Sequence, residues 1–124
     1  MKDLIALSNE YGKDPEFVLA GGGNTSLKED GFLFVKGSGT TLADIREEGF
    51  VKMDLGKLAA IMTKTYSPDL KTREAEVLED LMDARVPGET RRPSVETSLH
   101  ALIPCRYVVH LHPALVNGLT CAAD

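Results

Sequence analysis

The order of hairpin-linked and helix-separated strands is the feature that most restricts how this chain can fold. Asp30-Gly31 is a turn pair typical of β-hairpins, and it leads directly into the apolar run 32–35. Later strand-like runs, at 50–53 and 106–112, are separated from each other by segments with helical periodicity. This order favours helices packed on a mixed, largely antiparallel sheet over a doubly wound parallel sheet.

Helical periodicity and capping residues define the other expected elements. Asp54 and Ser94 are residue types that cap helix N-termini, and Pro104 is the type that ends a helix. No internal repeat or linker interrupts the chain, so we predict a single domain of mixed α/β type over residues 1–124. The remaining expected elements are an amphipathic helix over 2–12, a strand over 17–20, helices over 54–64, 72–85 and 95–103, and a helical start at 114–121.

The composition excludes several classes of protein. The 124 residues carry a net charge of −5 with scattered Lys and Arg, which does not suit a nucleic-acid binder. No run approaches the roughly 20 apolar residues of a membrane span, and residues 1–9 do not resemble a signal peptide. We therefore expect a cytoplasmic protein in which Cys105 and Cys121 are buried, reduced thiols.

The sharpest local signal is the pair of histidines in the last expected strand. Side chains alternate between the two faces of a strand, so His110 and His112 point to the same face. Two imidazoles at this spacing can reach one divalent ion, and neutral imidazole suits zinc and other late first-row metals. Taken alone, the pair favours two hydrogen-bonded histidines over a metal site, because two ligands do not complete one.

Glu96 changes that balance, because it stands in the first turn of the short helix that leads back to the histidine strand. The helix dipole favours an ionised carboxylate there, where it can serve as a general base beside a carbonyl or as a further metal ligand. His100 lies four residues on and on the same side of the helix. We interpret His100 as a packing residue or a partner of Glu96 rather than as a ligand.

Two small-residue segments can hold a phosphate. The run GGGNTS (residues 21–26) is expected as a turn after a strand, where backbone N–H groups, the Asn24 amide and the Ser26 hydroxyl can cradle an anion. It matches neither the dinucleotide fingerprint nor the Walker A loop. A second such segment follows the strand 32–35, at Gly37-Ser38-Gly39-Thr40. Taken singly, each segment, like Ser94, is more often a turn or a helix cap than a phosphate contact.

Taken together, these stretches resemble the class II aldolase/adducin family. The matching motifs cover nearly the whole chain in order, namely GGGNTS (21–26), KGSGT (36–40), RPSVET (92–97) followed by Leu99-His100, and VVHLHP (108–113). The closest resemblance is to the aldolase portion of rhamnulose-phosphate aldolase-type proteins, some of which carry a fused dehydrogenase domain. The resemblance implies a three-layer α/β/α fold around a mixed, largely antiparallel sheet, incomplete here at its C-terminus.

The resemblance also implies a role for each motif. Glu96 is the expected acid/base for forming an enediolate, and His110 and His112 are the expected ligands of a metal, usually zinc. The resemblance further implies a small phosphorylated sugar as substrate, a homotetramer, and retro-aldol cleavage of a ketose 1-phosphate to dihydroxyacetone phosphate and an aldehyde. The expected contacts to the substrate phosphate are Asn24, Ser38, Gly39 and Ser94.

Two departures from the family pattern leave alternatives open. Val95 stands where the family commonly has a small hydroxyl residue. A third metal histidine and a catalytic tyrosine, which the family supplies further along, are absent within residues 113–124, so we expect an N-terminal fragment of a longer domain. A pentulose-phosphate 4-epimerase or a methylthioribulose-phosphate dehydratase would use the same site. An adducin-like assembly domain is the non-catalytic alternative, which the two metal-type histidines disfavour.

Overall fold

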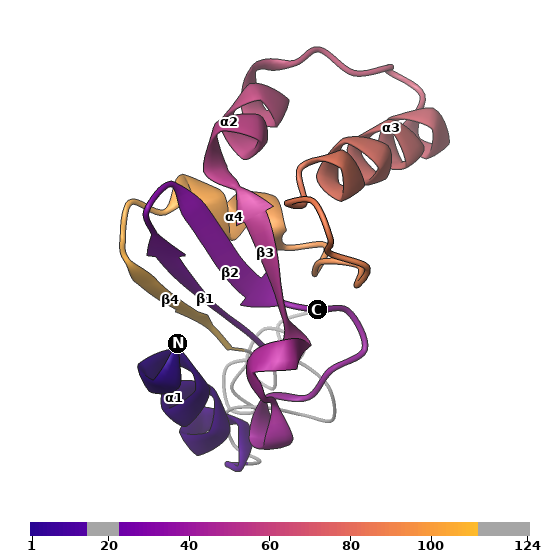
Figure 1. The fold of residues 1–124 in the computed structure, drawn as a ribbon. Coiled ribbons are helices and arrows are strands. Elements are labelled where there is room, and N and C mark those ends of the chain that lie inside the picture. Colours follow the sequence, from indigo (N-terminus) through magenta and orange to yellow (C-terminus); the bar gives the residue numbers. More distant parts are fainter. Residues whose placement is uncertain (15–22, 112–124) are drawn as a thin grey trace.

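The structure of the chain is a computed structural model that describes residues 1–14 and 23–111 (Figure 1). These residues form a four-stranded sheet with helices on both of its faces. Within them, no helix is long and apolar enough to cross a membrane. The elements are α1 (Lys2–Gly12), β1 (Asn24–Glu29), β2 (Phe32–Lys36), the short 3₁₀ helices η1 (Leu42–Asp44) and η2 (Glu47–Gly49), β3 (Phe50–Asp54), α2 (Leu55–Thr63), α3 (Leu70–Asp83), α4 (Thr97–Leu102) and β4 (Tyr107–His110).

The sheet has the strand order β3-β2-β1-β4, and all three neighbouring pairs are antiparallel. Asp30 and Gly31 both have positive φ, at 52° and 84°, as the tight turn of a β-hairpin requires. The predicted hairpin is therefore confirmed. The chain then leaves the sheet through the helices and returns as β4 on the far side of β1, where His110 stands opposite Asn24.

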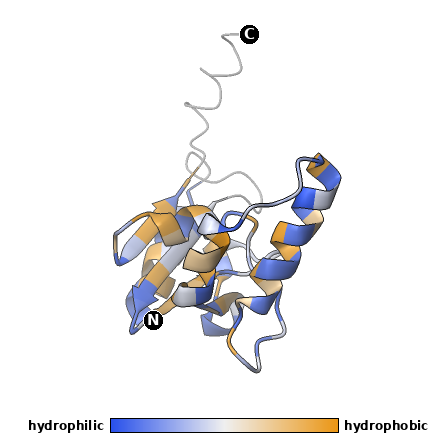
Figure 2. Ribbon diagram, turned by 90° about the horizontal axis from the view of Figure 1, so that it is seen from above, coloured by the Kyte–Doolittle hydropathy of each residue, from blue (hydrophilic) through white to orange (hydrophobic). Residues whose placement is uncertain are grey.

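The two faces of the sheet bury separate apolar clusters. Alternate residues of β2 and β3 face α2 and α3, and the opposite face packs against α1 and η1. This arrangement confirms the three-layer fold, and Figure 2 shows hydrophobic and hydrophilic residues alternating along the helices, as expected for helices that cover a sheet. The first cluster is centred on Leu33, Val35, Val51, Met53, Leu58, Ile61 and Leu81, and the second on Leu4, Leu27, Ile45 and Phe50.

The helices begin and end close to the positions predicted from the sequence, with one informative exception. Asp54 caps α2 through a hydrogen bond from the Lys57 backbone N–H, as expected. The short helix was predicted to start at 95 under a Ser94 cap, but α4 starts at Thr97, with Glu96 in the N-cap position. The Ser94 hydroxyl instead accepts a hydrogen bond from the Glu96 N–H, in a turn ahead of the helix.

Two other predictions were wrong, and one group lies outside the described residues. The expected turn over 21–26 is in part a strand, because β1 already begins at Asn24 and pairs on both sides. Cys105 is exposed rather than buried, because it lies in the bend between α4 and β4. The predicted strand at 17–20, the helical start at 114–121, and Cys121 within it, lie outside the described part of the chain.

Candidate metal and acid/base site

The candidate site forms where β1 and β4 pass beneath the start of α4. Asn24 and His110 are direct cross-strand neighbours, and Ser26 lies two residues along β1 on the same face. His100 of α4 reaches that face from above, where it contacts Ser26. Residues about 70 positions apart in the sequence therefore meet because an antiparallel register, and not sequence proximity, sets which side chains share a face.

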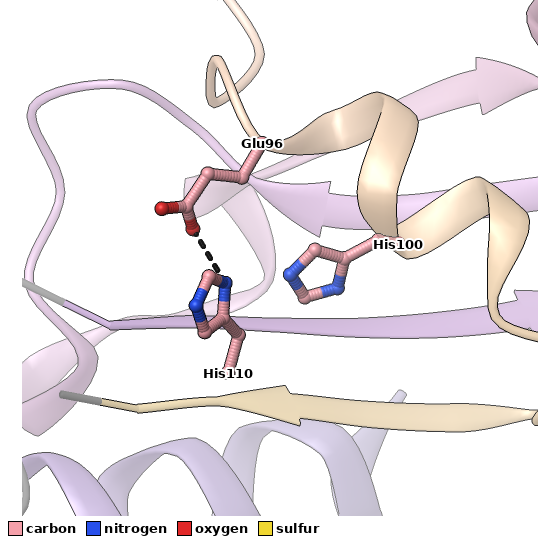
Figure 3. Close-up of side chains that lie close together, drawn as sticks. All are labelled: Glu96, His100 and His110. Atoms are coloured by element: carbon pink, nitrogen blue, oxygen red, sulfur yellow. Dashed lines mark ion pairs between the residues drawn. The ribbon is translucent and has the colours of Figure 1, made fainter. Parts of the chain in front are cut away.

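The Glu96 carboxylate occupies the centre of this site. Its Oε2 atom accepts a hydrogen bond of 2.5 Å from the Asn24 amide and lies 2.9 Å from Nδ1 of His110 (Figure 3). The side chains of Glu96 and His110 are 28% and 27% exposed, so both can be reached from solvent while being held by their neighbours. The carboxylate is thus fixed beside an imidazole and remains accessible to a substrate.

His100 is buried completely, with no exposed surface, and its two ring nitrogens have different surroundings. Nδ1 lies 2.6 Å from the Ser26 hydroxyl, and Nε2 has no hydrogen-bond partner among the described residues. The ring centroid is 6.1 Å from that of His110, with the two ring planes tilted by 43°. Figure 3 shows His100 projecting from α4 toward the Glu96–His110 pair.

Burial and neighbouring charge keep the His100 ring neutral. Loss of solvation on burial, helped by the nearby His110 and opposed by the charge of Glu96, lowers its pKa from 6.5 to about 4. A neutral imidazole at neutral pH keeps one nitrogen lone pair, which a metal ion needs. The electrostatics of the site therefore preserve the ligating form of His100.

Lys36 adds a buried positive charge near the carboxylate. Its side chain is 5% exposed, and Nζ donates a 2.7 Å hydrogen bond to the Thr40 carbonyl. Burial lowers the pKa of Lys36, and the negative charge of Glu96 partly opposes that effect. The sequence analysis placed Lys36 inside the KGSGT motif but gave it no role. Its location at the end of a strand gave no sign that the side chain turns inward.

Two segments that carry predicted phosphate contacts lie side by side. The Ser94 N–H donates to the Lys36 carbonyl at 3.1 Å, and the Ser38 N–H donates to the Arg92 carbonyl at 2.8 Å. Gly37 allows this approach, because a Cβ atom there would stand 2.2 Å from the Arg91 side chain and 3.1 Å from the Gly49 carbonyl oxygen. Ser38 and Gly39 are exposed and Ser94 is buried, so the structure brings Ser38, Gly39 and Ser94 to one region.

Asn24, the fourth predicted phosphate contact, lies directly against Glu96. One of its amide N–H groups is directed to the carboxylate, and its Oδ1 atom is buried without a hydrogen-bond partner in the described residues. Oδ1 accepts hydrogen bonds and does not bind an ionised phosphate. A phosphate contact would therefore use the second amide N–H, and the contact with Glu96 was not predicted from the sequence.

Three side chains in the site can hold a divalent metal. Glu96, His100 and His110 each offer one ligand atom, and these atoms lie within 4.8 Å of one another. One carboxylate oxygen with two imidazole nitrogens is a donor set suited to zinc and similar metals. The Nε2 atom of His100, buried without a partner in the described residues, is a further sign that this set fits a metal. His112, the second predicted ligand, lies outside the described residues.

An antiparallel sheet between helical layers, with a carboxylate and imidazoles gathered at the sheet edge, defines a class of mixed α/β domain whose donor set suits a divalent metal. Over residues 2–124, the sequence matches the family described as Class II Aldolase and Adducin N-terminal domain. The chain belongs to this family, as the sequence motifs predicted.

Two similar proteins support the assignment. A solved structure, the N-terminal class II aldolase domain of a conserved protein from Thermoplasma acidophilum, is 31% identical and superposes with a TM-score of 0.80 over 94% of this chain and 56% of its own. A protein named uncharacterized oxidoreductase YuxG, from Bacillus subtilis, is 31% identical over 131 aligned positions. That alignment covers 98% of this chain and 18% of the relative, so the chain spans about a fifth of the relative's length.

Proposed function

We propose that this chain supplies the acid/base and metal-binding residues of an enzyme that cleaves a ketose 1-phosphate to dihydroxyacetone phosphate and an aldehyde. The observation that carries the proposal is the 2.9 Å contact between Glu96 and His110 in a chain of the class II aldolase family. A carboxylate held beside a metal-type ligand suits a reaction that moves a proton next to a polarised carbonyl.

The proposed reaction needs one proton to be exchanged at carbon. In the cleavage direction a base of the complete site takes the proton of the C4 hydroxyl, the C3–C4 bond breaks, and the electron pair of that bond remains on the dihydroxyacetone phosphate part as an enediolate. The protonated Glu96 carboxyl then donates its proton to C3, and the proton taken from the C4 hydroxyl restores it through solvent. In the condensation direction the Glu96 carboxylate removes the C3 proton. The Asn24 amide holds the carboxylate in place for this step. A divalent metal, when bound, supplies positive charge that polarises the substrate oxygens.

The proposed ligands and phosphate contacts follow the sequence analysis. His110 and His112 bind the metal, which we propose to be zinc. Ser38, Gly39 and Ser94 bind the phosphate where their two segments adjoin, and Asn24 contributes its second amide N–H. The side-by-side backbone contacts of the two segments support this grouping. The buried Lys36 ammonium, which donates to the Thr40 carbonyl in the segment of Ser38 and Gly39, supplies a positive charge that would favour an anion there.

The proposal also concerns the complete protein, its location in the cell and the alternative functions. The chain spans 56% of the solved relative, so we propose that the complete site includes residues outside this chain, as a homotetramer with sites shared between subunits would. We further propose a cytoplasmic location. A pentulose-phosphate 4-epimerase and a methylthioribulose-phosphate dehydratase remain the alternatives that use the same residues, and an adducin-like assembly domain remains the non-catalytic alternative.

The decisive experiment compares Glu96→Gln with the wild type in the complete natural protein that contains this chain. The amide keeps the shape of the side chain and cannot exchange a proton, so turnover of ketose 1-phosphates should fall by about 10²–10⁴-fold while the metal content is kept. The matched control is Glu10→Gln, the same substitution at an exposed position of α1, which should leave turnover unchanged. Equal turnover of Glu96→Gln and wild type would refute the acid/base role. Wild-type epimerisation of pentulose phosphates without cleavage would replace aldolase with epimerase.

A further inference from the structure

A cavity between α3 and residues 92–95 is the feature that the proposed function does not use. Its volume is about 620 Å³, within the range of about 300–1,000 Å³ that is typical of small-molecule sites. Figure 1 shows the chain turning back after α3 and running toward α4, and this returning segment supplies one wall of the cavity. Among the described residues, those of the candidate metal and acid/base site do not line it, so the cavity is a separate feature of the molecule.

The apolar side of α3 faces this cavity. Leu81 is buried in the core, whereas Leu78 is partly buried and Ala75 is exposed, and all three line the cavity. Val95, with 72% of its surface exposed, lines it from the segment 92–95. Apolar residues scattered singly over a surface are common, but apolar residues gathered in a concave surface are typical of a binding site. The cavity therefore offers an apolar lining to a ligand.

Three positively charged side chains line the same cavity, namely Lys71, Arg73 and Arg92. In the described part of the chain, none of the three forms an ion pair. The Glu74 carboxylate is the only acidic group among the described lining residues, so positive charge is in excess here although the whole chain carries a net charge of −5. Cations gathered in a concave surface raise the local concentration of anions. The lining thus suits a ligand that is both anionic and apolar.

The position of Lys71 and Arg73 in α3 is electrostatically unfavourable for the helix itself. Both stand within the first four residues, next to the partial positive charge of the helix N-terminus, and this first turn contains no acidic residue. The helix start is stabilised separately by Asp69, whose side chain accepts a hydrogen bond from the Thr72 backbone N–H. Residues that oppose local stability are expected where a ligand uses them. The two cations are therefore better explained by a bound anion than by the stability of α3.

From these observations we propose that the cavity between α3 and residues 92–95 is a second ligand site, which binds an organic carboxylate or phosphate carrying an apolar group. The anionic group pairs with the three cations, and the apolar group packs against α3 and Val95. This site is independent of the reaction proposed above. It nevertheless adjoins the acid/base group, because the segment 92–95 leads directly to Glu96. A ligand held in the cavity therefore contacts the segment from which Glu96 projects.

The test is calorimetric titration of the complete natural protein that contains this chain with octyl phosphate, octanoate and the neutral octanol, each below the concentration at which it aggregates. The two anions should bind more tightly than octanol, and the tighter of the two identifies the preferred anionic group. Lys71→Gln and Arg73→Gln should each weaken binding of the anions by about two- to fivefold, as expected for exposed charge pairs, and leave octanol binding unchanged. The matched control is Lys2→Gln, at an exposed position of α1, which should have no effect.

A second pair of variants locates the ligand. Ala75→Trp fills the cavity from an exposed position of α3, so it should abolish binding of both anions, whereas Ala59→Trp, at an exposed position of α2, should leave binding unchanged. Substitutions at exposed positions rarely disturb the fold, and circular dichroism identifies any variant that does. Anion binding that survives Ala75→Trp, charge variants that bind both anions as tightly as the wild type, or a wild-type protein that binds neither anion would each overturn the proposal.

Discussion

At the scale of single residues, Asn24 is the side chain on which the position of the acid/base group depends. Its amide donates to Glu96 from a buried position, so Asn24→Asp places two carboxylates in contact. Like charges this close cannot both ionise in a partly buried site. We expect Asn24→Asp to lower the free energy of unfolding at pH 7 by about 3 kcal/mol, and the loss to shrink at pH 5, where the pair can share a proton. Urea denaturation with a chelator present measures both values.

The control for this substitution is Asn24→Ala, which removes the hydrogen bond without adding charge. It should cost about 1–3 kcal/mol, with little difference between pH 7 and pH 5. Asn24→Asp and Asn24→Ala of equal stability at both pH values would show that the Asn24 amide does not face the carboxylate as described.

Single residues also mark what the sequence could and could not reveal. His110 was recognised from its two-residue spacing from His112 in an expected strand, and Glu96 from its place at the start of the helix before that strand. The contact of Ser26 with His100 joins positions 74 residues apart, and only the register of β1 against β4 and the placement of α4 create it. Asn24 was assigned to a turn because it follows three glycines, a residue type that favours turns. In the structure, β1 begins directly after these glycines.

At the scale of elements, the docking of α1 on η1 depends on a close approach at Gly12. A Cβ atom there would stand 2.4 Å from the Ala43 nitrogen and 2.5 Å from the Leu42 carbonyl carbon, and backbone atoms cannot move aside as a flexible side chain can. Gly12→Ala should therefore lower the free energy of unfolding by about 1–3 kcal/mol through overpacking. Thermal or urea unfolding measures the change.

An exposed residue of the same helix provides the comparison. Glu10 is exposed, so Glu10→Ala should change stability by no more than about 0.5 kcal/mol. Equal effects of Gly12→Ala and Glu10→Ala would mean that α1 does not pack closely on η1. Because Asn9 also donates hydrogen bonds to the carbonyls of Leu42 and Ile45, a shifted α1 would lose these bonds as well.

The elements themselves were largely predictable, and the reason lies in local chemistry. The Asp30-Gly31 turn and the Asp54 cap each act within a few residues, so the sequence indicates them directly. The start of α4 was misplaced because Ser94 has the residue type of a cap and yet forms a turn with Glu96 and Thr97. The backbone pairing of residues 36–38 with 92–94 determines where α4 begins. A contact between segments this far apart in the sequence cannot be read from the residues around Ser94.

At the scale of the whole molecule, the buried site makes stability depend on pH. The unfolded chain binds a proton on His100 below its ordinary pKa of 6.5, and the folded protein does so only below about 4. Protons are therefore taken up by the unfolded state as the pH falls through this window, which favours unfolding. Stability from this residue is fully present above pH 6.5 and is lost progressively toward pH 4, by an amount on the order of 3 kcal/mol.

The measurement is urea denaturation of the metal-free chain, with a chelator present, between pH 7 and pH 4. Metal must be absent because a bound ion would itself hold the ring unprotonated. His100→Gln is the matched variant, since its amide can still contact Ser26 and carries no titrating group. Its stability should fall less steeply than that of the wild type over this range, although it starts lower at pH 7. Parallel curves would mean that His100 has the same pKa in the folded and the unfolded protein, and burial would then not hold its ring neutral.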